Sequence, residues 1–154
     1  MTVEAIPKGY RTITPYMTVR DAARAIEFYK QAFGAVEKGA MKTPDGKIMH
    51  AELLIGDSIV MLADEFPQYG ALSPQSTGGT GMGLHIYIED VDSAFDRAVK
   101  AGATVEMPVA DMFWGDRYGK LADPFGHKWS IGTHKRDATM AEMEQAMNQM
   151  PKSA

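Results

Sequence analysis

The chain has 154 residues, 16 Lys and Arg against 20 Asp and Glu, a formal net charge of −4 and no cysteine. This length supports one domain with a sizeable core and excludes two large ones, while the acidic balance gives no broad cationic face for a nucleic acid. The missing cysteines exclude disulfides and thiolate metal sites, and the absence of a leader or a long apolar run predicts a cytoplasmic protein with no membrane association.

The first half of the chain predicts a strand, a helix and three further strands. After Asp21 the apolar side chains recur at helical spacing until Gly34, which ends the helix. Gly56 and Asp57 split two apolar runs as a hairpin turn does. The predicted strands span 13–19, 36–41, 48–55 and 58–63.

The second half repeats this order after a glycine-rich linker at 67–83. Asp21 and Asp92, like Thr14 and His85, are 71 residues apart, which indicates an internal duplication. A helix is predicted at 92–101, with strands at 84–89, 104–107, 117–122 and 127–133. We therefore expect one α+β domain over 1–154 with two βαβββ modules, about 9–66 and 84–134, whose curved mixed sheets surround a cavity. Each module alone exposes one sheet face, so the two combine either within one chain or across a dimer.

The tail at about 139–150 is predicted to form a further helix. Thr139 and Glu142 have the spacing of a capping box, and methionines recur every three or four residues on one face. Such a stripe favours packing on the protein's own body or on a partner subunit. A homodimer is expected.

Four segments together with the duplication carry a resemblance to a known superfamily. They are 21–29, 50–53, 113–117 and 123–129. The chain resembles the vicinal oxygen chelate superfamily, which includes glyoxalase I, extradiol dioxygenases and the fosfomycin and bleomycin resistance proteins, and it is most similar to the PhnB-like subgroup. The resemblance covers roughly 10–134.

The resemblance also implies where a metal site would lie. Metal-dependent members hold a divalent ion with residues on the first and last strands of each module. Those positions fall on Thr14, Met61, His85 and Ser130, of which only His85 is a strong ligand. We therefore expect no metal at the usual site, although a relocated divalent ion on His50, Glu52 and His85 stays open.

Strand alternation predicts which side chains point into the cavity. Apolar residues on the strand after the linker should pack under the helices, so His85 and Tyr87 point the other way. A two-residue turn at 56–57 places Glu52 opposite Met61, a cavity position by the resemblance.

The same counting applies to the last hairpin. A turn centred on 124–125 sets Gly119 opposite Ser130, which sends Arg117 into the cavity and Trp129 into the core. The predicted ligand-binding residues are Thr14, Tyr16, His50, Glu52, Met61, His85, Tyr87, Phe113, Trp114, Arg117 and Ser130.

These residues favour a protein that binds a small, possibly aromatic molecule without the usual metal, for sequestration or detoxification. The alternative is a lyase, isomerase or dioxygenase-type enzyme that uses a relocated metal or metal-free acid/base chemistry. In that case Glu52, His85 and Arg117 are the catalytic candidates, with Glu52 as base and Arg117 stabilising an oxyanion. A third hypothesis is an interaction module that captures another protein through the methionine-rich tail.

Overall fold

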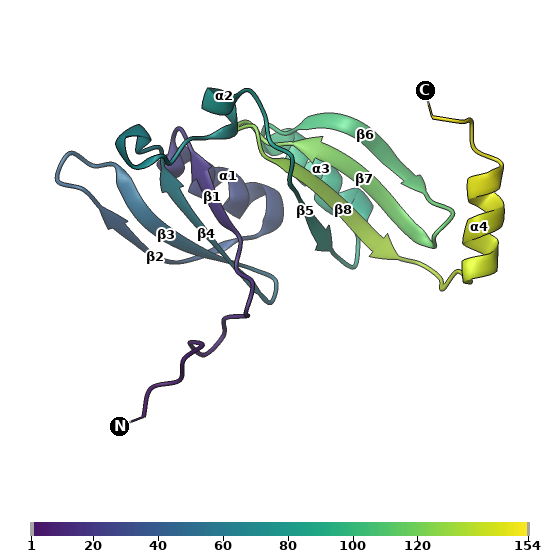
Figure 1. Ribbon diagram of the computed structural model, residues 1–154, viewed down its shortest axis with the longest axis horizontal. Helices are drawn as coiled ribbons and strands as arrows, with labels where there is room; N and C mark the ends of the chain where they lie inside the picture. Colours follow the sequence, from purple (N-terminus) through teal and green to yellow (C-terminus); the bar gives the residue numbers. More distant parts are fainter. Residues whose placement is uncertain (1, 154) are drawn as a thin grey trace.

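A computed structural model describes residues 2–153 and contains two four-stranded mixed sheets (Figure 1). Module one comprises β1 (Tyr16–Val19), α1 (Ala22–Phe33), β2 (Val36–Lys42), β3 (Ile48–Ile55) and β4 (Ser58–Asp64). Module two comprises β5 (Gly83–Tyr87), α3 (Val91–Ala101), β6 (Thr104–Asp111), β7 (Asp116–Ala122) and β8 (Lys128–His134). The linker carries the short helices η1 (Pro67–Tyr69) and α2 (Pro74–Thr77), and α4 (Met140–Asn148) ends the chain. The expected α+β fold of two βαβββ modules with a C-terminal helix is confirmed.

Both sheets have the same strand order. The orders are β1-β4-β3-β2 and β5-β8-β7-β6, with the first and last strands parallel in each module. Within module one, Ile55 pairs with Ser58 and Glu52 with Met61, as the predicted two-residue turn requires. The duplication is therefore visible in pairing as well as in element order.

The predicted repeat distance of 71 residues is wrong by two. Helix α3 begins one residue earlier than expected, because the side chain of Asp90 caps it by accepting the backbone N–H of Ser93. Asp90 is thus the counterpart of Asp21, 69 residues away. At this distance Tyr16 corresponds to His85, while Thr14 lies ahead of β1.

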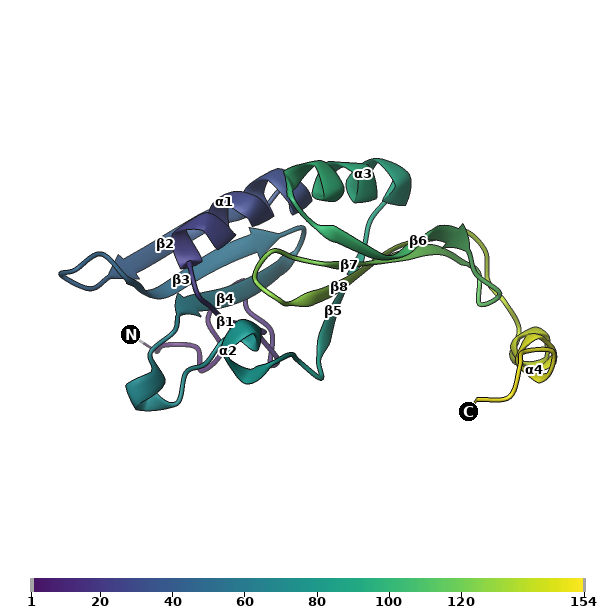
Figure 2. The ribbon, with the colours of Figure 1, turned by 90° about the horizontal axis from the view of Figure 1, so that it is seen from above.

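The two modules pack together through their helices. Helices α1 and α3 contact each other and lie on the same side of the sheets (Figure 2). Tyr29 of α1 is fully buried and donates a 2.6 Å hydrogen bond to Asp123 of module two, which also accepts one from the indole of Trp129. The Trp129 ring lies 4.7 Å from that of Phe33, so its predicted core position is confirmed. These contacts join the modules into one body.

The opposite side of each sheet, called here the open face, is the one that α1 and α3 leave uncovered (Figure 2). The two sheets lie side by side, and their open faces do not meet within one chain (Figures 1 and 2). Tyr16 and Tyr87, on the first strands of the two modules, are accordingly 53% and 65% exposed. A single chain thus leaves the expected cavity between open faces unclosed.

Helix α4 extends away from both modules (Figure 1). The predicted capping box of Thr139 and Glu142 is present. None of the described residues of this helix is buried, and Met140 is 69% exposed, so it does not pack on its own body. Packing on a partner subunit stays a prediction.

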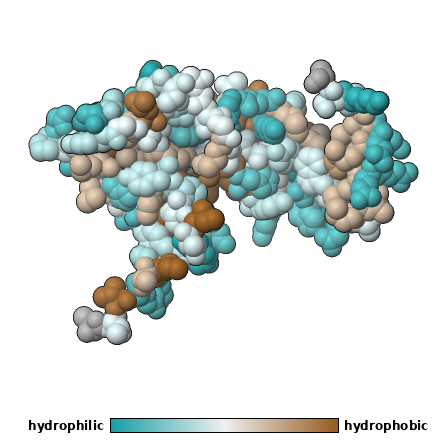
Figure 3. Space-filling view, viewed as in Figure 1, coloured by the Kyte–Doolittle hydropathy of each residue, from teal (hydrophilic) through white to brown (hydrophobic). Residues whose placement is uncertain are grey.

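The N-terminal segment also carries exposed apolar side chains. Val3 and Ile13 are 90% and 85% exposed, and this segment is seen in brown at the lower left of Figure 3. Between residues 2 and 153, no helix is both long and apolar enough to cross a bilayer.

Candidate functional site

The open face of module one carries a chain of hydrogen bonds. The hydroxyl of Tyr16 lies 2.9 Å from Nδ1 of His50, and Nε2 of His50 lies 3.1 Å from Oε1 of Glu52. Tyr10, from the segment before β1, donates its hydroxyl proton to Oε2 of the same carboxylate. Tyr16 comes from β1 and the His–Glu pair from alternate positions of β3, which is why all three share one face.

The charge of Glu52 sets the direction of this chain. Hydrogen bonds lower the pKa of Glu52, the one from Tyr10 most and the one from His50 next. The hydrogen bond between Tyr10 and Glu52 also raises the pKa of Tyr10. An ionised carboxylate only accepts hydrogen bonds, so Nε2 of His50 is the donor to Glu52. In the neutral form of the ring, Nδ1 is then the acceptor for the Tyr16 hydroxyl. The order is Tyr16 O–H to His50, and His50 N–H to Glu52.

The open face of module two is aromatic instead. The His85 ring lies 4.5 Å from that of Tyr87 and 5.7 Å from that of Tyr118, with which it stacks. Trp114 meets Tyr118 edge to face at 5.3 Å, and Phe113 meets Trp114 at 5.1 Å. The aromatic cluster, as it is called below, comprises His85, Tyr87, Phe113, Trp114 and Tyr118.

A buried carboxylate organises this cluster. Asp116 is 4% exposed and accepts hydrogen bonds from the Tyr87 hydroxyl at 3.1 Å, the Trp114 indole at 3.1 Å and His134 Nδ1 at 2.7 Å. Burial opposes its ionisation, but these three donors together lower the pKa of Asp116 below its ordinary value. The pKa of His134 is raised by its hydrogen bonds to Asp116 and Asp137. Asp116 therefore fixes the ring orientations of two aromatic side chains.

His85 is held against the sheet at the β5 edge of the cluster. Its Nδ1 lies 2.7 Å from the hydroxyl of Ser130, and a Cβ added to Gly132 would come within 3.3 Å of its ring. Burial lowers the pKa of His85, with Asp116 partly opposing this. His85 is thus favoured as a neutral ring that can stack on apolar or aromatic groups.

Arg117 does not point into the predicted cavity, which corrects the expectation from strand counting. It pairs with Thr133 on the helix side of the sheet. Its guanidinium donates two hydrogen bonds to Asp92 and one to Asp111, contacts that raise its pKa and keep it charged. Arg117 therefore has a structural ion-pairing role on the opposite face.

The reason lies in the turn between β7 and β8. Five residues, 123–127, separate the paired Ala122 and Lys128. The backbone N–H of Gly126 donates to the carbonyl of Asp123, and Gly126 itself has a left-handed backbone conformation with φ +89°, which adds one residue to the turn. The pairing of β7 with β8 is therefore shifted by one residue from the expected register, so each β7 side chain lies on the other face of the sheet from the one predicted. Lys120 consequently lies opposite Ser130.

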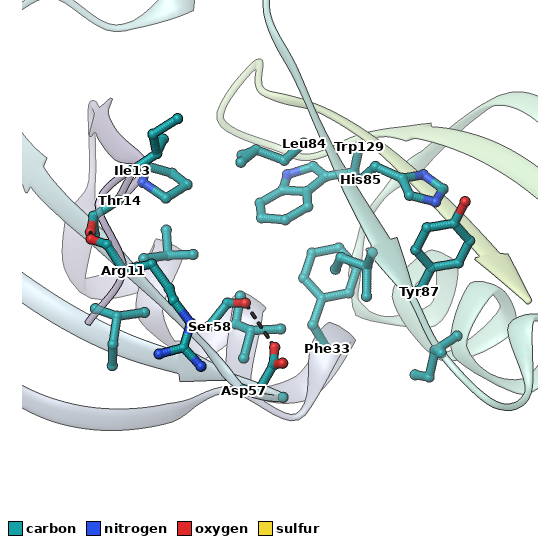
Figure 4. Close-up of a pocket in the computed structure, with 17 residues that line it drawn as sticks. Arg11, Ile13, Thr14, Phe33, Asp57, Ser58, Leu84, His85, Tyr87 and Trp129 are labelled. Atoms are coloured by element: carbon teal, nitrogen blue, oxygen red, sulfur yellow. Dashed lines mark hydrogen bonds between the residues drawn. The ribbon is translucent and has the colours of Figure 1, made fainter. Parts of the chain in front are cut away.

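A cleft of about 770 Å³ separates β5 from module one (Figure 4). His85 and Tyr87 line one side, and Arg11, Asp57 and Ser58 the other (Figure 4). The rest of the lining is mainly apolar, including Ile13, Phe33, Ile55, Ile59, Leu84, Ile86, Ile88 and Trp129. The aromatic cluster therefore begins inside the cleft and continues over the open face.

Residues 12–131 match the model of the Glyoxalase/Bleomycin resistance protein/Dioxygenase superfamily. The chain belongs to this superfamily. Its members' fold agrees with the two βαβββ modules described above, so the resemblance in the sequence is confirmed.

Individual relatives support this membership. A protein of Mycobacterium tuberculosis is 48% identical over 139 residues, which cover 88% of this chain and 82% of that protein. The crystal structure of an Arabidopsis thaliana gene product aligns with a TM-score of 0.64 and 27% identity over 79% of this chain and 98% of that one. A PhnB protein from Bacillus cereus shares the fold, with a TM-score of 0.63 and 18% identity over 80% and 99% of the two chains.

The usual metal positions of the superfamily are poor in ligands. With the corrected repeat distance they fall on Tyr16 and Met61 in module one and on His85 and Ser130 in module two. A phenol, a thioether and a hydroxyl do not make a typical donor set for zinc, nickel or iron beside one imidazole. The residues present do not fit the superfamily's divalent ion.

The relocated site is not assembled within one chain either. Glu52 and His50 lie on module one, whereas His85 bonds to Ser130 on module two. In the part of the chain that the structure describes, no three His, Asp or Glu side chains gather as metal ligands do.

The other predicted ligand-binding residues fall into four groups. Tyr16, His50, Glu52 and Met61 share the open face of module one, and His85, Tyr87 and Ser130 that of module two. Phe113 and Trp114 lie between β6 and β7, and Thr14 lines the cleft. Tyr10, Asp116 and Tyr118 were not predicted from the sequence. Asp116 and Tyr118 would have been placed on the open face if the β7–β8 register had been counted with Gly126 as an additional turn residue.

Proposed function

We propose that this protein binds a small aromatic or amphipathic molecule on the aromatic cluster, for sequestration or detoxification. The observation that carries the proposal is the set of ring faces fixed by Asp116, which continues into the cleft through His85 and Tyr87. Apolar walls supply burial and a few polar groups supply orientation, which is the usual composition of small-molecule sites. A volume of about 770 Å³ accommodates a drug-sized compound.

The proposal includes a homodimer in the cytoplasm. The open face of module one from a second copy would cover the aromatic cluster, because the two open faces do not meet within one chain and leave Tyr16 and Tyr87 more than half exposed. Glu52 and Lys120 occupy corresponding positions on the two faces and carry opposite charges, which favours module one against module two rather than like against like. Membership of a superfamily named for a drug-resistance protein supports the sequestering role.

Tryptophan fluorescence tests the binding proposal. The chain has two tryptophans, so Trp114→Phe leaves Trp129, which lines the cleft, as the single reporter. Titration with naphthalene and indole derivatives should change its emission saturably. Tyr87→Ala should weaken binding about tenfold, since an aromatic contact is worth about 1 kcal/mol beyond burial.

Tyr69→Ala is the matched control for that variant. Tyr69 is 78% exposed and is not part of the cleft lining, so its removal should leave the affinity unchanged. Equal affinities for Tyr87→Ala and the unaltered protein, or no saturable change with any compound, would contradict the proposal.

A second candidate function is an enzyme of the same superfamily, such as an isomerase or lyase, using metal-free acid/base chemistry. The Tyr16–His50–Glu52 chain is the observation that favours it. Arg117 is no longer a candidate for stabilising an oxyanion, because it faces the helix side.

A further inference from the structure

The geometry points to Tyr16 as a general base, driven by His50 and Glu52, that removes a proton from a neutral, enolisable carbonyl compound. The three side chains form an unbroken line of hydrogen bonds of 2.9 and 3.1 Å that ends at a hydroxyl on an exposed residue. A hydroxyl, an imidazole and an orienting carboxylate in this order are the arrangement that activates an oxygen for proton transfer.

The proton path follows from the direction of the hydrogen bonds. Because Tyr16 gives its proton to Nδ1 of His50, its oxygen lone pairs are directed away from the ring and are free to accept another proton. As a substrate C–H bond breaks, its proton moves to the Tyr16 oxygen and the Tyr16 proton moves to His50. The electron pair of the C–H bond becomes the enolate. Return of the proton to the substrate oxygen completes a keto–enol isomerisation without any co-reactant.

Glu52 acts through His50 and is a positioning residue. It fixes the Nε2–H tautomer and stabilises the imidazolium that forms during transfer. Tyr10 holds the second oxygen of the carboxylate, so Glu52 stays in the plane that His50 requires. The role of the base thus passes from Glu52, the candidate from sequence, to Tyr16.

The charge on this face selects the substrate class. Glu52 is ionised and lies across the His50 ring from the reacting hydroxyl, so its negative charge on this face disfavours an anionic keto acid. A neutral 1,3-diketone, whose carbon acidity lies near that of a phenol, matches the base best. The further preference for an aromatic diketone rests on the proposed function, whereas the proton transfer itself does not.

Deuterium exchange in D₂O tests the inference on the full-length protein. The probes are 1-phenylbutane-1,3-dione and pentane-2,4-dione, with loss of the central C–H signal followed by NMR against buffer alone. The protein should accelerate exchange, and Tyr16→Phe should reduce the acceleration at least tenfold, because general base catalysis contributes about 100-fold or more. Tyr69→Phe, an exposed tyrosine elsewhere, should not change it.

A second measurement separates positioning from folding. Glu52→Gln should lower kcat with little change in KM, and the ¹⁵N shifts of His50 should move from the Nε2–H tautomer to a mixture. Faster exchange of the phenyl compound supports both proposals; equal acceleration of both diketones supports the base and removes the aromatic preference. No acceleration, or Tyr16→Phe as active as the unaltered protein, overturns the base.

Discussion

The two modules have the same fold but very different open faces. At corresponding positions module one has Tyr16 and Glu52, where module two has His85 and Lys120. Module one uses its face for a line of hydrogen bonds, and module two for aromatic rings around one buried acid. The helix sides, in contrast, both carry the apolar core, with Leu62 and Ile131 fully buried.

The two sides of each sheet differ in how freely their residues can be substituted. Substitution on the helix side loses buried apolar contacts at a cost of about 2–5 kcal/mol for a large side chain, so that pattern is retained. The open faces contribute few apolar side chains to the core. They can therefore acquire separate chemical roles, which a second copy would bring together.

The largest expected effect is on the buried acid of module two. Asp116→Ala leaves the donors of Tyr87, Trp114 and His134 without their acceptor, so we expect the free energy of unfolding to fall by about 3 kcal/mol. Urea denaturation followed by circular dichroism measures this. Asp137→Ala, which removes only an exposed partner of His134, should change stability by less than about 0.5 kcal/mol. Similar values for both variants would contradict the organising role of Asp116.

The next effect concerns ligand affinity. Trp114→Ala should weaken binding of an aromatic probe about tenfold, because it removes one ring from the cluster, whereas His50→Gln on the other module should weaken it much less. Isothermal titration calorimetry compares the two. Equal losses would show that the division of roles between the open faces is wrong.

The two faces should also respond to pH in opposite directions. The pKa of His134 is raised in the folded state, so its contribution to stability is present below the ordinary histidine pKa and is lost as pH rises through the raised value. The pKa of Glu52 is lowered, so its contribution is present above the ordinary glutamate pKa and is lost as pH falls through the lowered value.

Unfolding free energies measured between about pH 3 and pH 9 bracket both groups. His134→Gln should flatten the alkaline decline only, and Glu52→Gln the acid decline only. If the alkaline decline is unchanged in His134→Gln, the predicted contribution of His134 to stability is contradicted.

The smallest expected effect is local to Tyr10. Tyr10→Phe removes the hydrogen bond that lowers the pKa of Glu52 most, so the pKa of that carboxyl should rise toward its ordinary value. Carboxyl ¹³C NMR follows the titration. A pKa that does not move would show that the N-terminal segment does not reach the sheet in solution.

How far the sequence predicts this structure depends on the turns. The two-residue turn at 56–57 fixes its hairpin register, so the pairing of Glu52 with Met61 follows from counting. The turn at 123–127 contains one more residue than the count assumed, and a slip of one residue moved Arg117 to the wrong face. Alternation predicts a side chain's face only as well as the turn length is known.

Other parts of the site depend on contacts that no local pattern encodes. Tyr10 meets Glu52 from 42 residues away, and Asp116 collects donors from β5, β8 and the preceding loop. Sequence reasoning placed His50, Glu52, His85 and Tyr87 on the open faces, but not the order of their hydrogen bonds. That order requires side-chain conformations in three dimensions.

The open face of one copy is proposed to work with the aromatic cluster of another, and mixing two impaired variants tests this arrangement. Tyr16→Phe impairs module one, and Trp114→Ala impairs module two. If the site lies between copies, a mixed dimer has one site with both faces intact, and exchange of 1-phenylbutane-1,3-dione should recover to about one quarter of the unaltered rate after random reassociation. If the mixture stays at the level of the separate variants after subunits have exchanged, the claim is contradicted.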